Sequence, residues 1–343
     1  MLGLLLTGVA AAAPSYKVVD LSVKGYPESS GVAAIVGHQA GDFTLTYYRI
    51  KCGPRTWCRY AQTHGALWSG GTSAQSVVDL NPPGYFQSTV TGMANGVQVG
   101  FGYAAQPTYK QQYHALMWRG NAKSMVDLHP ASFNGSIAYA TDGTVQAGSG
   151  WISGVGSHAL IWFGSAASVV DLNPLGLIGS EAYAVSNGVE GGYAFAPGGE
   201  HAYIWRGTAA SGRDLNPAGF SSSYIKGVDG KTEVGAVATT YGWHAYMWQG
   251  VSSKGVDLHT SRYIESEAVA ASGGKQVGWG GLLSTYHAVV WSGTSGSCLD
   301  LQQFLPSNFV SSRAFAIAPD GSIFGFAQDA NWNTHAVLWI PQR

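Results

Sequence analysis

The stretch HAYIWRGTAASGRDLNP, residues 201–217, contains the two motifs that decide the fold. The first is His-x-x-x-Trp, and the second is an Asp-Leu pair that begins nine residues after the tryptophan. Both recur along the chain. The first motif begins at His64, His114, His158, His201, His244, His287 and His335 and ends at Trp68, Trp118, Trp162, Trp205, Trp248, Trp291 and Trp339. The pair begins at Asp20, Asp79, Asp127, Asp171, Asp214, Asp257 and Asp300. The central copies repeat every 43 or 44 residues, so one structural unit is used seven times.

The fourth copy divides into four short strands. SEAYAV (180–185) and VEGGYAF (189–195) flank an Asn-Gly turn, a strong hairpin signal. HAYIW (201–205) is apolar on both faces, as expected of a covered strand, and a fourth strand ends at Leu215 before Asn-Pro. A four-stranded unit of about 40–45 residues has the size of a propeller blade. We therefore predict an all-β, seven-bladed β-propeller of four-stranded antiparallel blades, a single domain over residues 14–343.

The two ends of the repeat array complement each other. The first Asp-Leu pair, at Asp20, has no His-x-x-x-Trp before it, and the last motif, at His335, has no Asp-Leu after it. We expect residues 16–21 to add the outer strand to the last blade. This N-terminal strand would close the ring and remove its open sheet edges.

Composition favours an extracellular protein. Charged residues make up 11% of the chain, below the roughly 25% usual in soluble domains, and the net charge of −1 argues against a nucleic-acid partner. Residues 1–13 are apolar and end in small residues like a secretory signal, too short to span a membrane. No membrane span is predicted later in the chain. Cys52 and Cys58 bracket a short loop and are expected to form a disulfide in an oxidising compartment.

The His-Ala-x-x-Trp element followed by Val-Asp-Leu-Asn-Pro resembles the bacterial HAF extracellular repeats. The resemblance runs from about Lys17 to Trp339, with Leu, Tyr or Val in place of Phe in several copies and His64-Gly65-Ala66 in the first. It implies a secreted or cell-surface bacterial propeller. It implies no established reaction and so leaves the function open.

The repeated polar residues are interpreted as structural. Seven histidines spread around a ring do not converge as a catalytic or metal site requires, so each is predicted to donate a hydrogen bond within its blade. The repeated aspartates are predicted to accept backbone N–H groups, and the tryptophans to fill the core. No zinc, calcium, P-loop or nucleophile motif is present, so no catalytic residue, metal site or cofactor is predicted. The acids left for an enzyme are Glu181, Glu200, Glu265 and Glu267.

Aromatic residues gather where a propeller places its variable loops, namely between strands two and three and between blades. Such side chains suit sugar stacking or a protein contact, although folding back over the blade ends is an open alternative. The candidate ligand-binding residues are Trp57, Tyr113, Trp151, Tyr241, Trp243 and Trp332. The longest elaboration is an insertion in the first blade, at about 44–63. We predict non-enzymatic binding of a carbohydrate or protein partner. Alternatives are a subunit that self-assembles into an extracellular fibre or layer, and a polysaccharide lyase or hydrolase.

Overall fold

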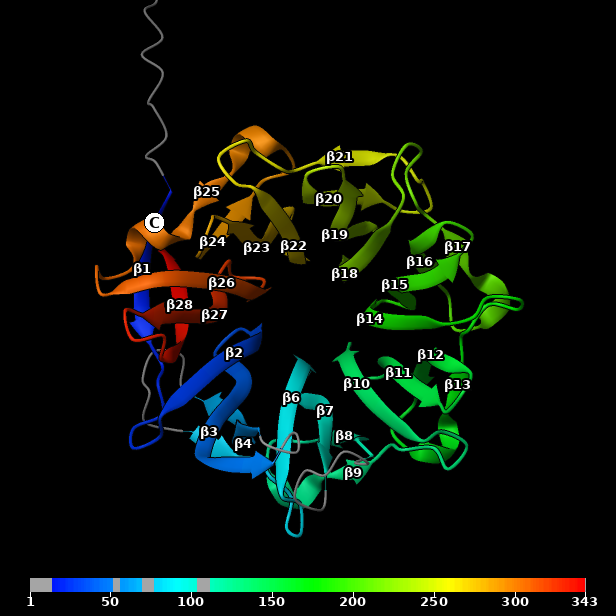
Figure 1. Ribbon diagram of the computed structural model, residues 1–343, viewed down its shortest axis with the longest axis horizontal. Coiled ribbons are helices and arrows are strands. Elements are labelled where there is room, and N and C mark those ends of the chain that lie inside the picture. Colours follow the sequence, from blue (N-terminus) through cyan, green and yellow to red (C-terminus); the bar gives the residue numbers. More distant parts are fainter. Residues whose placement is uncertain (1–13, 52–55, 70–76, 104–111, 343) are drawn as a thin grey trace, which may run out of the picture.

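The computed structural model describes residues 14–51, 56–69, 77–103 and 112–342. These residues form seven four-stranded antiparallel sheets around a central axis, and the four strands of each sheet follow one another from the axis outward (Figure 1). The predicted all-β, seven-bladed propeller is therefore confirmed. Residues 1–13 and Cys52 lie outside the described residues, so the signal-like segment and the Cys52–Cys58 disulfide stay predictions.

We number the blades from 1 to 7 and give their strands from the axis outward. Blade 1 consists of β2 (Glu28–Ile35), β3 (His38–Lys51), β4 (Trp57–Ser69) and β5 (Val77–Asp79), and blade 2 consists of β6 (Gln87–Ala94), β7 (Val97–Tyr103), β8 (His114–Trp118) and β9 (Val126–Asp127). Blade 3 consists of β10 (Gly135–Thr141), β11 (Gln146–Ile152), β12 (Gly156–Trp162) and β13 (Val170–Asp171), and blade 4 consists of β14 (Ser180–Ser186), β15 (Val189–Ala196), β16 (Gly199–Trp205) and β17 (Arg213–Asp214). Blade 5 consists of β18 (Ser223–Asp229), β19 (Thr232–Thr239), β20 (Gly242–Gln249) and β21 (Gly255–Asp257), and blade 6 consists of β22 (Glu265–Ser272), β23 (Lys275–Gly281), β24 (Tyr286–Trp291) and β25 (Leu299–Asp300). Blade 7 consists of β26 (Phe309–Ile317), β27 (Ile323–Asp329), β28 (Thr334–Gln342) and β1 (Ser15–Asp20).

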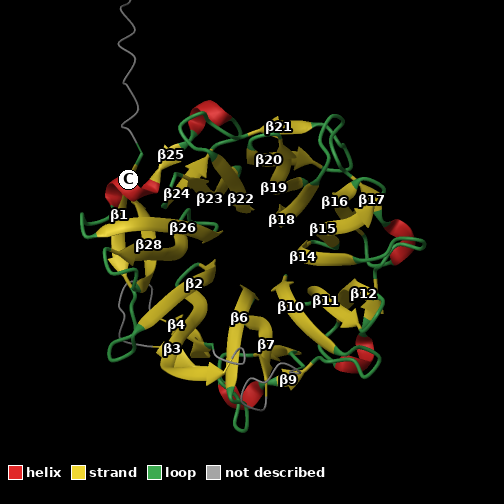
Figure 2. Cartoon of the chain, viewed as in Figure 1, coloured by secondary structure: helices red, strands yellow, loops and turns green. Residues whose placement is uncertain are grey.

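Short 3₁₀ turns at the outer rim were not anticipated from the sequence (Figure 2). Four connect the third and fourth strands of blades 2, 3, 4 and 6, and one follows β25: η1 (Ala122–Ser124), η2 (Ala166–Ser168), η3 (Ala209–Ser211), η4 (Ser295–Ser297) and η5 (Leu301–Phe304). In the first four, the last serine accepts a backbone N–H from the residue after the repeated tryptophan, as in Arg206 to Ser211 at 2.8 Å. None of the described helical segments is long and apolar enough to cross a bilayer.

The N-terminal strand closes the ring. β1 pairs antiparallel with β28, from Ser15 opposite Gln342 to Asp20 opposite Val337, and the two lie side by side in Figure 1. The N–H of Leu21 continues the pairing to the carbonyl of Ala336 at 2.8 Å. The predicted closure is therefore confirmed.

The repeated tryptophans lie between neighbouring blades. All seven are at most 1% exposed. Trp205 of blade 4, for example, packs with Ala147 and Leu172 of blade 3. Several also hydrogen-bond the preceding blade, as Trp248 does when its Nε1 donates to the carbonyl of Leu215 at 3.0 Å. Each tryptophan thus joins two sheets that the hydrogen-bond ladders leave separate.

Candidate functional site

The repeated histidine and aspartate of a blade bond to each other. In blade 4, Nδ1 of His201 on β16 lies 2.7 Å from Oδ2 of Asp214 on β17, and Oδ1 of Asp214 accepts the N–H of Asn216 at 2.8 Å. The same His–Asp contact measures 2.7–3.0 Å in blades 1 to 6. In blade 7, Nδ1 of His335 bonds the hydroxyl of Ser22 at 2.9 Å. The histidine and the aspartate, considered separately in the sequence, are partners.

This pair is linked to the next blade by a buried serine. The N–H of Ala202, which follows His201, donates to Oγ of Ser223 at 2.9 Å, and Ser223 donates to Oδ1 of Asn216 at 2.6 Å. Ser223 begins the innermost strand of blade 5 and is fully buried. The repeated polar residues therefore fix the angle between blades as well as the sheet edge.

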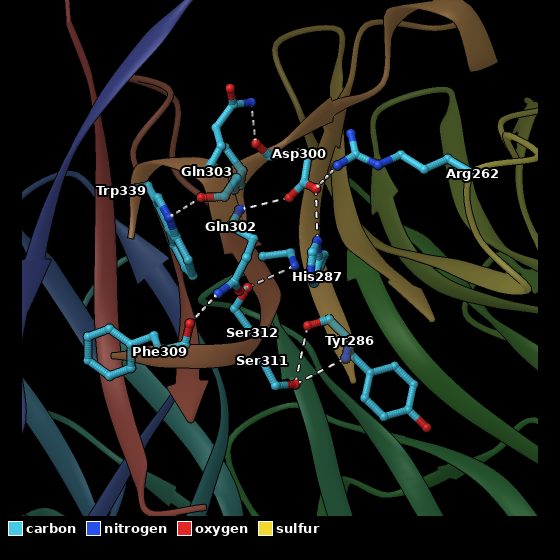
Figure 3. Close-up of polar contacts among 12 residues, drawn as sticks. Arg262, Tyr286, His287, Asp300, Gln302, Gln303, Phe309, Ser311, Ser312 and Trp339 are labelled. Carbon is cyan, nitrogen blue, oxygen red and sulfur yellow. Dashed lines mark hydrogen bonds and ion pairs between the residues drawn. The ribbon is translucent and has the colours of Figure 1, made fainter. Parts of the chain in front are cut away.

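Figure 3 shows the corresponding network between blades 6 and 7, where Asp300 is 3% exposed as a side chain. His287 Nδ1 lies 2.8 Å from Asp300 Oδ2, and Arg262 Nη2 lies 2.7 Å from the same oxygen. Burial alone would raise the pKa of Asp300. The hydrogen bond and charge of His287, the N–H of Gln302 and Arg262 outweigh burial and hold that pKa below its usual value.

We expect His201→Ala, His158→Ala and His244→Ala to lower the free energy of unfolding by similar amounts, about 1 kcal/mol each. This is the low end of the roughly 1–3 kcal/mol for an unsatisfied buried group, because the partner aspartates are 41–46% exposed and water can replace the imidazole. Thermal melts of the three variants check the equivalence. A loss of ligand binding at one position alone would instead assign that histidine to a site.

Two rings of side chains line the central channel. Each innermost strand has a buried serine at or near its start, namely Ser29, Ser88, Ser136, Ser180, Ser223, Ser266 and Ser312. The residues one and three positions after this serine point to the same side of the strand. The first ring consists of Ser30, Thr89, Ile137, Glu181, Tyr224, Glu267 and Arg313. The second consists of Val32, Thr91, Tyr139, Tyr183, Lys226, Val269 and Phe315, which together with the residues after them line a cavity of about 350 Å³. Charged and phenolic side chains are therefore concentrated in blades 3 to 7.

Both cations of these rings lie on aromatic faces. Lys226 Nζ is 3.4 Å from the centroid of the Tyr183 ring and 5.4 Å from that of Tyr224. Arg313 Cζ is 3.7 Å from the Tyr286 ring and 4.6 Å from the Trp279 ring. We call this set the channel mouth and define it as Tyr139, Glu181, Tyr183, Tyr224, Lys226, Glu267, Trp279, Tyr286 and Arg313.

The carboxylates of the channel mouth accept hydrogen bonds from neutral aromatic donors. Tyr139 donates to Oε2 of Glu181 at 3.2 Å, and Trp279 Nε1 donates to Oε2 of Glu267 at 2.9 Å. Burial raises the pKa of Glu267 and lowers that of Lys226, although each charge partly offsets the other. Within the described residues, neither Lys226 nor Arg313 forms an ion pair with a carboxylate. Their N–H groups are therefore available to a ligand.

Two of the four glutamates named from the sequence, Glu181 and Glu267, belong to the channel mouth, and the charges of Glu200 and Glu265 act on it. Burial and the charges of Glu267, Glu200 and Glu265 raise the pKa of Tyr224, and Glu181 and Glu200 both act on Lys226. Tyr139, Tyr183, Tyr224, Lys226 and Arg313 were not identified from the sequence. They lie on innermost strands, whereas the sequence directed attention to the loops.

The aromatic candidates divide into two groups. Tyr113 and Trp151 have ring centroids 5.5 Å apart, and Trp243 packs 4.9 Å from Tyr224 at the channel mouth. The other three are exposed, with no ring contact to another described residue, and their exposed fractions are 59% for Trp57, 85% for Tyr241 and 52% for Trp332. The structure therefore brings only Trp243 into contact with the channel mouth.

The comparisons with known proteins identify the fold. No family model matches the chain, and no curated protein matches it in sequence. Among solved structures it is similar to the propeller domain of the trilobed protease from Pyrococcus furiosus, at 10% identity and a TM-score of 0.62, over 92% of this chain and 97% of that one. That domain is described as having an open velcro topology, whereas β1 closes the ring here.

Two peptidases also contain a similar propeller. The acylaminoacyl peptidase of Pyrococcus horikoshii is 11% identical with a TM-score of 0.55, over 95% of this chain and 54% of that one. A puromycin-hydrolyzing peptidase of Mycobacterium tuberculosis is 13% identical with a TM-score of 0.50, over 93% and 61%. The chain thus spans about half to three fifths of these two enzymes. At such identities the likeness establishes a seven-bladed β-propeller and nothing about activity.

Proposed function

We propose that the chain is a secreted, non-enzymatic propeller that binds a carbohydrate at the channel mouth. The observation that carries the proposal is that two cations without an ion pair, Lys226 and Arg313, lie beside aromatic rings and carboxylates around one opening. Sugars present apolar C–H faces to rings and hydroxyl pairs to charged acceptors and donors, so such a lining suits them. The resemblance to HAF repeats and the sparsely charged composition support secretion from a bacterium.

Asymmetry of the channel mouth supports a defined ligand rather than a general pore. Ser30, Thr89 and Ile137 leave blades 1 to 3 with small or apolar side chains in the first ring, whereas blades 4 to 7 supply Glu181, Tyr224, Glu267 and Arg313. A ligand therefore meets its polar contacts from one side and has room on the other.

The test is a glycan array with the purified chain, followed by calorimetry with the strongest hit. We expect Lys226→Met to weaken binding about tenfold or more, because a hydrogen bond to a charged group is lost while the apolar stem is kept. Tyr241→Ala is the control, since Tyr241 is an exposed residue of the turn between β19 and β20 and does not belong to the channel mouth. Loss of binding in Tyr241→Ala but not in Lys226→Met would place the ligand on the loops and contradict the proposal. Shortened glycan products would contradict the non-enzymatic part.

Self-assembly is a second candidate, favoured by exposed apolar residues between blades 3 and 4. Val155, Leu175 and Ile178 are 57%, 103% and 73% exposed, and Gly156, next to Val155, approaches the backbone of Ile178. Such neighbouring apolar residues suit a contact between copies. Negative-stain images of the purified protein separate the two candidates, because discrete discs favour binding and filaments favour assembly.

A further inference from the structure

The hairpin of β3 and β4 extends well beyond its counterparts in the other blades. β3 has 14 residues and β4 has 13, whereas β15 and β16 of blade 4 have 8 and 7. The described residues of the first-blade insertion anticipated from the sequence therefore extend the antiparallel sheet, after a register shift between Thr44 and Thr46. In its outer part Tyr47 lies opposite Ala61, Arg49 opposite Arg59, and Lys51 opposite Trp57. Because partners across a ladder point to the same side, side chains alternate between two faces.

One face of this hairpin lies on blade 2. The hydroxyl of Tyr60 donates to Oε1 of Gln87 at 2.8 Å, and Gln62 Nε2 donates to the carbonyl of Phe86 at 2.6 Å. The ring of Tyr48 lies 5.7 Å from that of Phe86. These contacts fix which way the hairpin faces, so the opposite side is presented outward.

The opposite side, which we call the basic face, consists of Tyr47, Arg49, Lys51, Trp57 and Arg59. Its three cations are exposed, and none forms an ion pair with a carboxylate of the described residues. Arg49 and Arg59 are direct cross-strand partners, an arrangement of like charges that destabilises a sheet. The Arg59 guanidinium lies 3.4 Å from the Tyr47 ring centroid, which holds it in place.

Among the described residues, only one carboxylate acts on a residue of the basic face, and it belongs to Glu28. Glu28 lies at its inner end, where burial and the hydrogen bond and charge of Glu28 raise the pKa of Tyr47 to about 12. The outer end combines three cations with the exposed indole of Trp57. Unpaired cations beside an aromatic ring are arranged for an anionic ligand that also has an apolar face.

We propose that the basic face binds an acidic polysaccharide, with Arg49, Lys51 and Arg59 on its carboxylate or sulfate groups and Trp57 against a sugar ring. Alternate residues of a strand are about 7 Å apart, so separate cations reach anionic groups on successive sugars. The site is distinct from the channel mouth, because it lies on blade 1 and the charged residues of the channel mouth lie on blades 4 to 7. It adds a ligand class, anionic glycans, to the proposed function without depending on it.

The experiment measures affinity of the full chain for polygalacturonate, dextran sulfate, uncharged dextran and single-stranded DNA at low and high salt. We expect at least one acidic glycan to bind more tightly than dextran, and the stronger of the two distinguishes carboxylate from sulfate recognition. Arg49→Gln/Arg59→Gln is expected to weaken that binding about tenfold or more and to reduce its salt dependence. Arg119→Gln/Lys123→Gln, two exposed cations of blade 2, changes the net charge equally and should leave it intact.

Several results would overturn the inference. Acidic glycans that bind no better than dextran, or equal losses in both double variants, would remove the basic face as a site. If single-stranded DNA bound as tightly as the acidic glycan, and if Arg49→Gln/Arg59→Gln weakened both equally, the basic face would be a general polyanion surface. If Lys226→Met abolished binding of the acidic glycan while Arg49→Gln/Arg59→Gln kept it, the anionic ligand would lie at the channel mouth, and the proposed function would survive without the basic face.

Discussion

Deleting residues 1–21 is expected to abolish the cooperative thermal unfolding of the propeller. The deletion removes β1 and leaves β28 as an exposed edge, which invites pairing with other chains. It also removes Tyr16 and Leu21, which are 7% and 1% exposed, at about 1.5–3 kcal/mol each. The Nε1 of Trp68 loses its acceptor, the carbonyl of Leu21 at 3.0 Å, for roughly 1–3 kcal/mol more. Together these losses approach the 5–15 kcal/mol that a whole domain has.

Deletion of residues 1–13 alone is the control, because it keeps β1. Circular dichroism melts and size-exclusion chromatography of both truncated chains report the result. We expect the shorter deletion to melt as the full chain does and the longer one to aggregate or melt without a cooperative transition. If deletion of residues 1–21 also left a cooperative melt like that of the full chain, the ring would be closed by contacts other than β1, and the closing strand would be dispensable.

The fold could be predicted because the same local sequence signals recur from one copy of the repeat to the next. The predicted second strand of the fourth copy, 189–195, agrees with β15 (Val189–Ala196), because the Asn-Gly turn before it is a local signal that acts over a few residues. The complementary halves at the ends of the repeat array specified the closure of the ring. Tertiary packing did not have to be known for either inference.

The channel mouth could not be predicted in the same way. Tyr183, Lys226 and Arg313 lie on three different innermost strands and are at least 43 residues apart in the sequence. They line one opening because the radius of the ring brings innermost strands together, and a single sequence does not specify that radius. The His–Asp pairing would have been easier to predict than the channel mouth, because His201 and Asp214 lie on adjacent strands of one blade at a sequence spacing shared by most copies.

The aromatic candidates illustrate a different limit. Trp57, Tyr113 and Trp243 belong to one class in the sequence, yet one is exposed on the basic face, one is packed in an aromatic cluster and one lies at the channel mouth. Where each of these residues lies depends on whether its hairpin extends beyond the rest of its blade, as the hairpin of β3 and β4 does, or turns at the end of the blade. Composition alone does not distinguish these cases.

Glu233→Gln is expected to stabilise the protein above neutral pH. Glu233 lies opposite Trp248, is 1% exposed, and accepts the N–H of Gly250 at 2.9 Å. Burial raises its pKa from 4.5 to about 7. The folded state therefore holds a proton that the unfolded state releases between pH 4.5 and 7, and stability falls as pH rises through this window. The loss is at most about 3 kcal/mol above pH 7.

Blade 6 provides the reciprocal control, because Gln276 occupies the equivalent position. Its Oε1 accepts the N–H of Gly293 at 2.8 Å and its Nε2 donates to the carbonyl of Gly274 at 3.0 Å, so an amide meets both needs without a charge. Urea unfolding at pH 5 and pH 8 should show Glu233→Gln gaining stability mainly at pH 8 and Gln276→Glu losing it there. A Glu233→Gln variant whose stability follows that of the parent chain between the two pH values would mean that Glu233 is ionised in the folded protein. Its burial would then be offset by the N–H of Gly250 and the charge of Arg206.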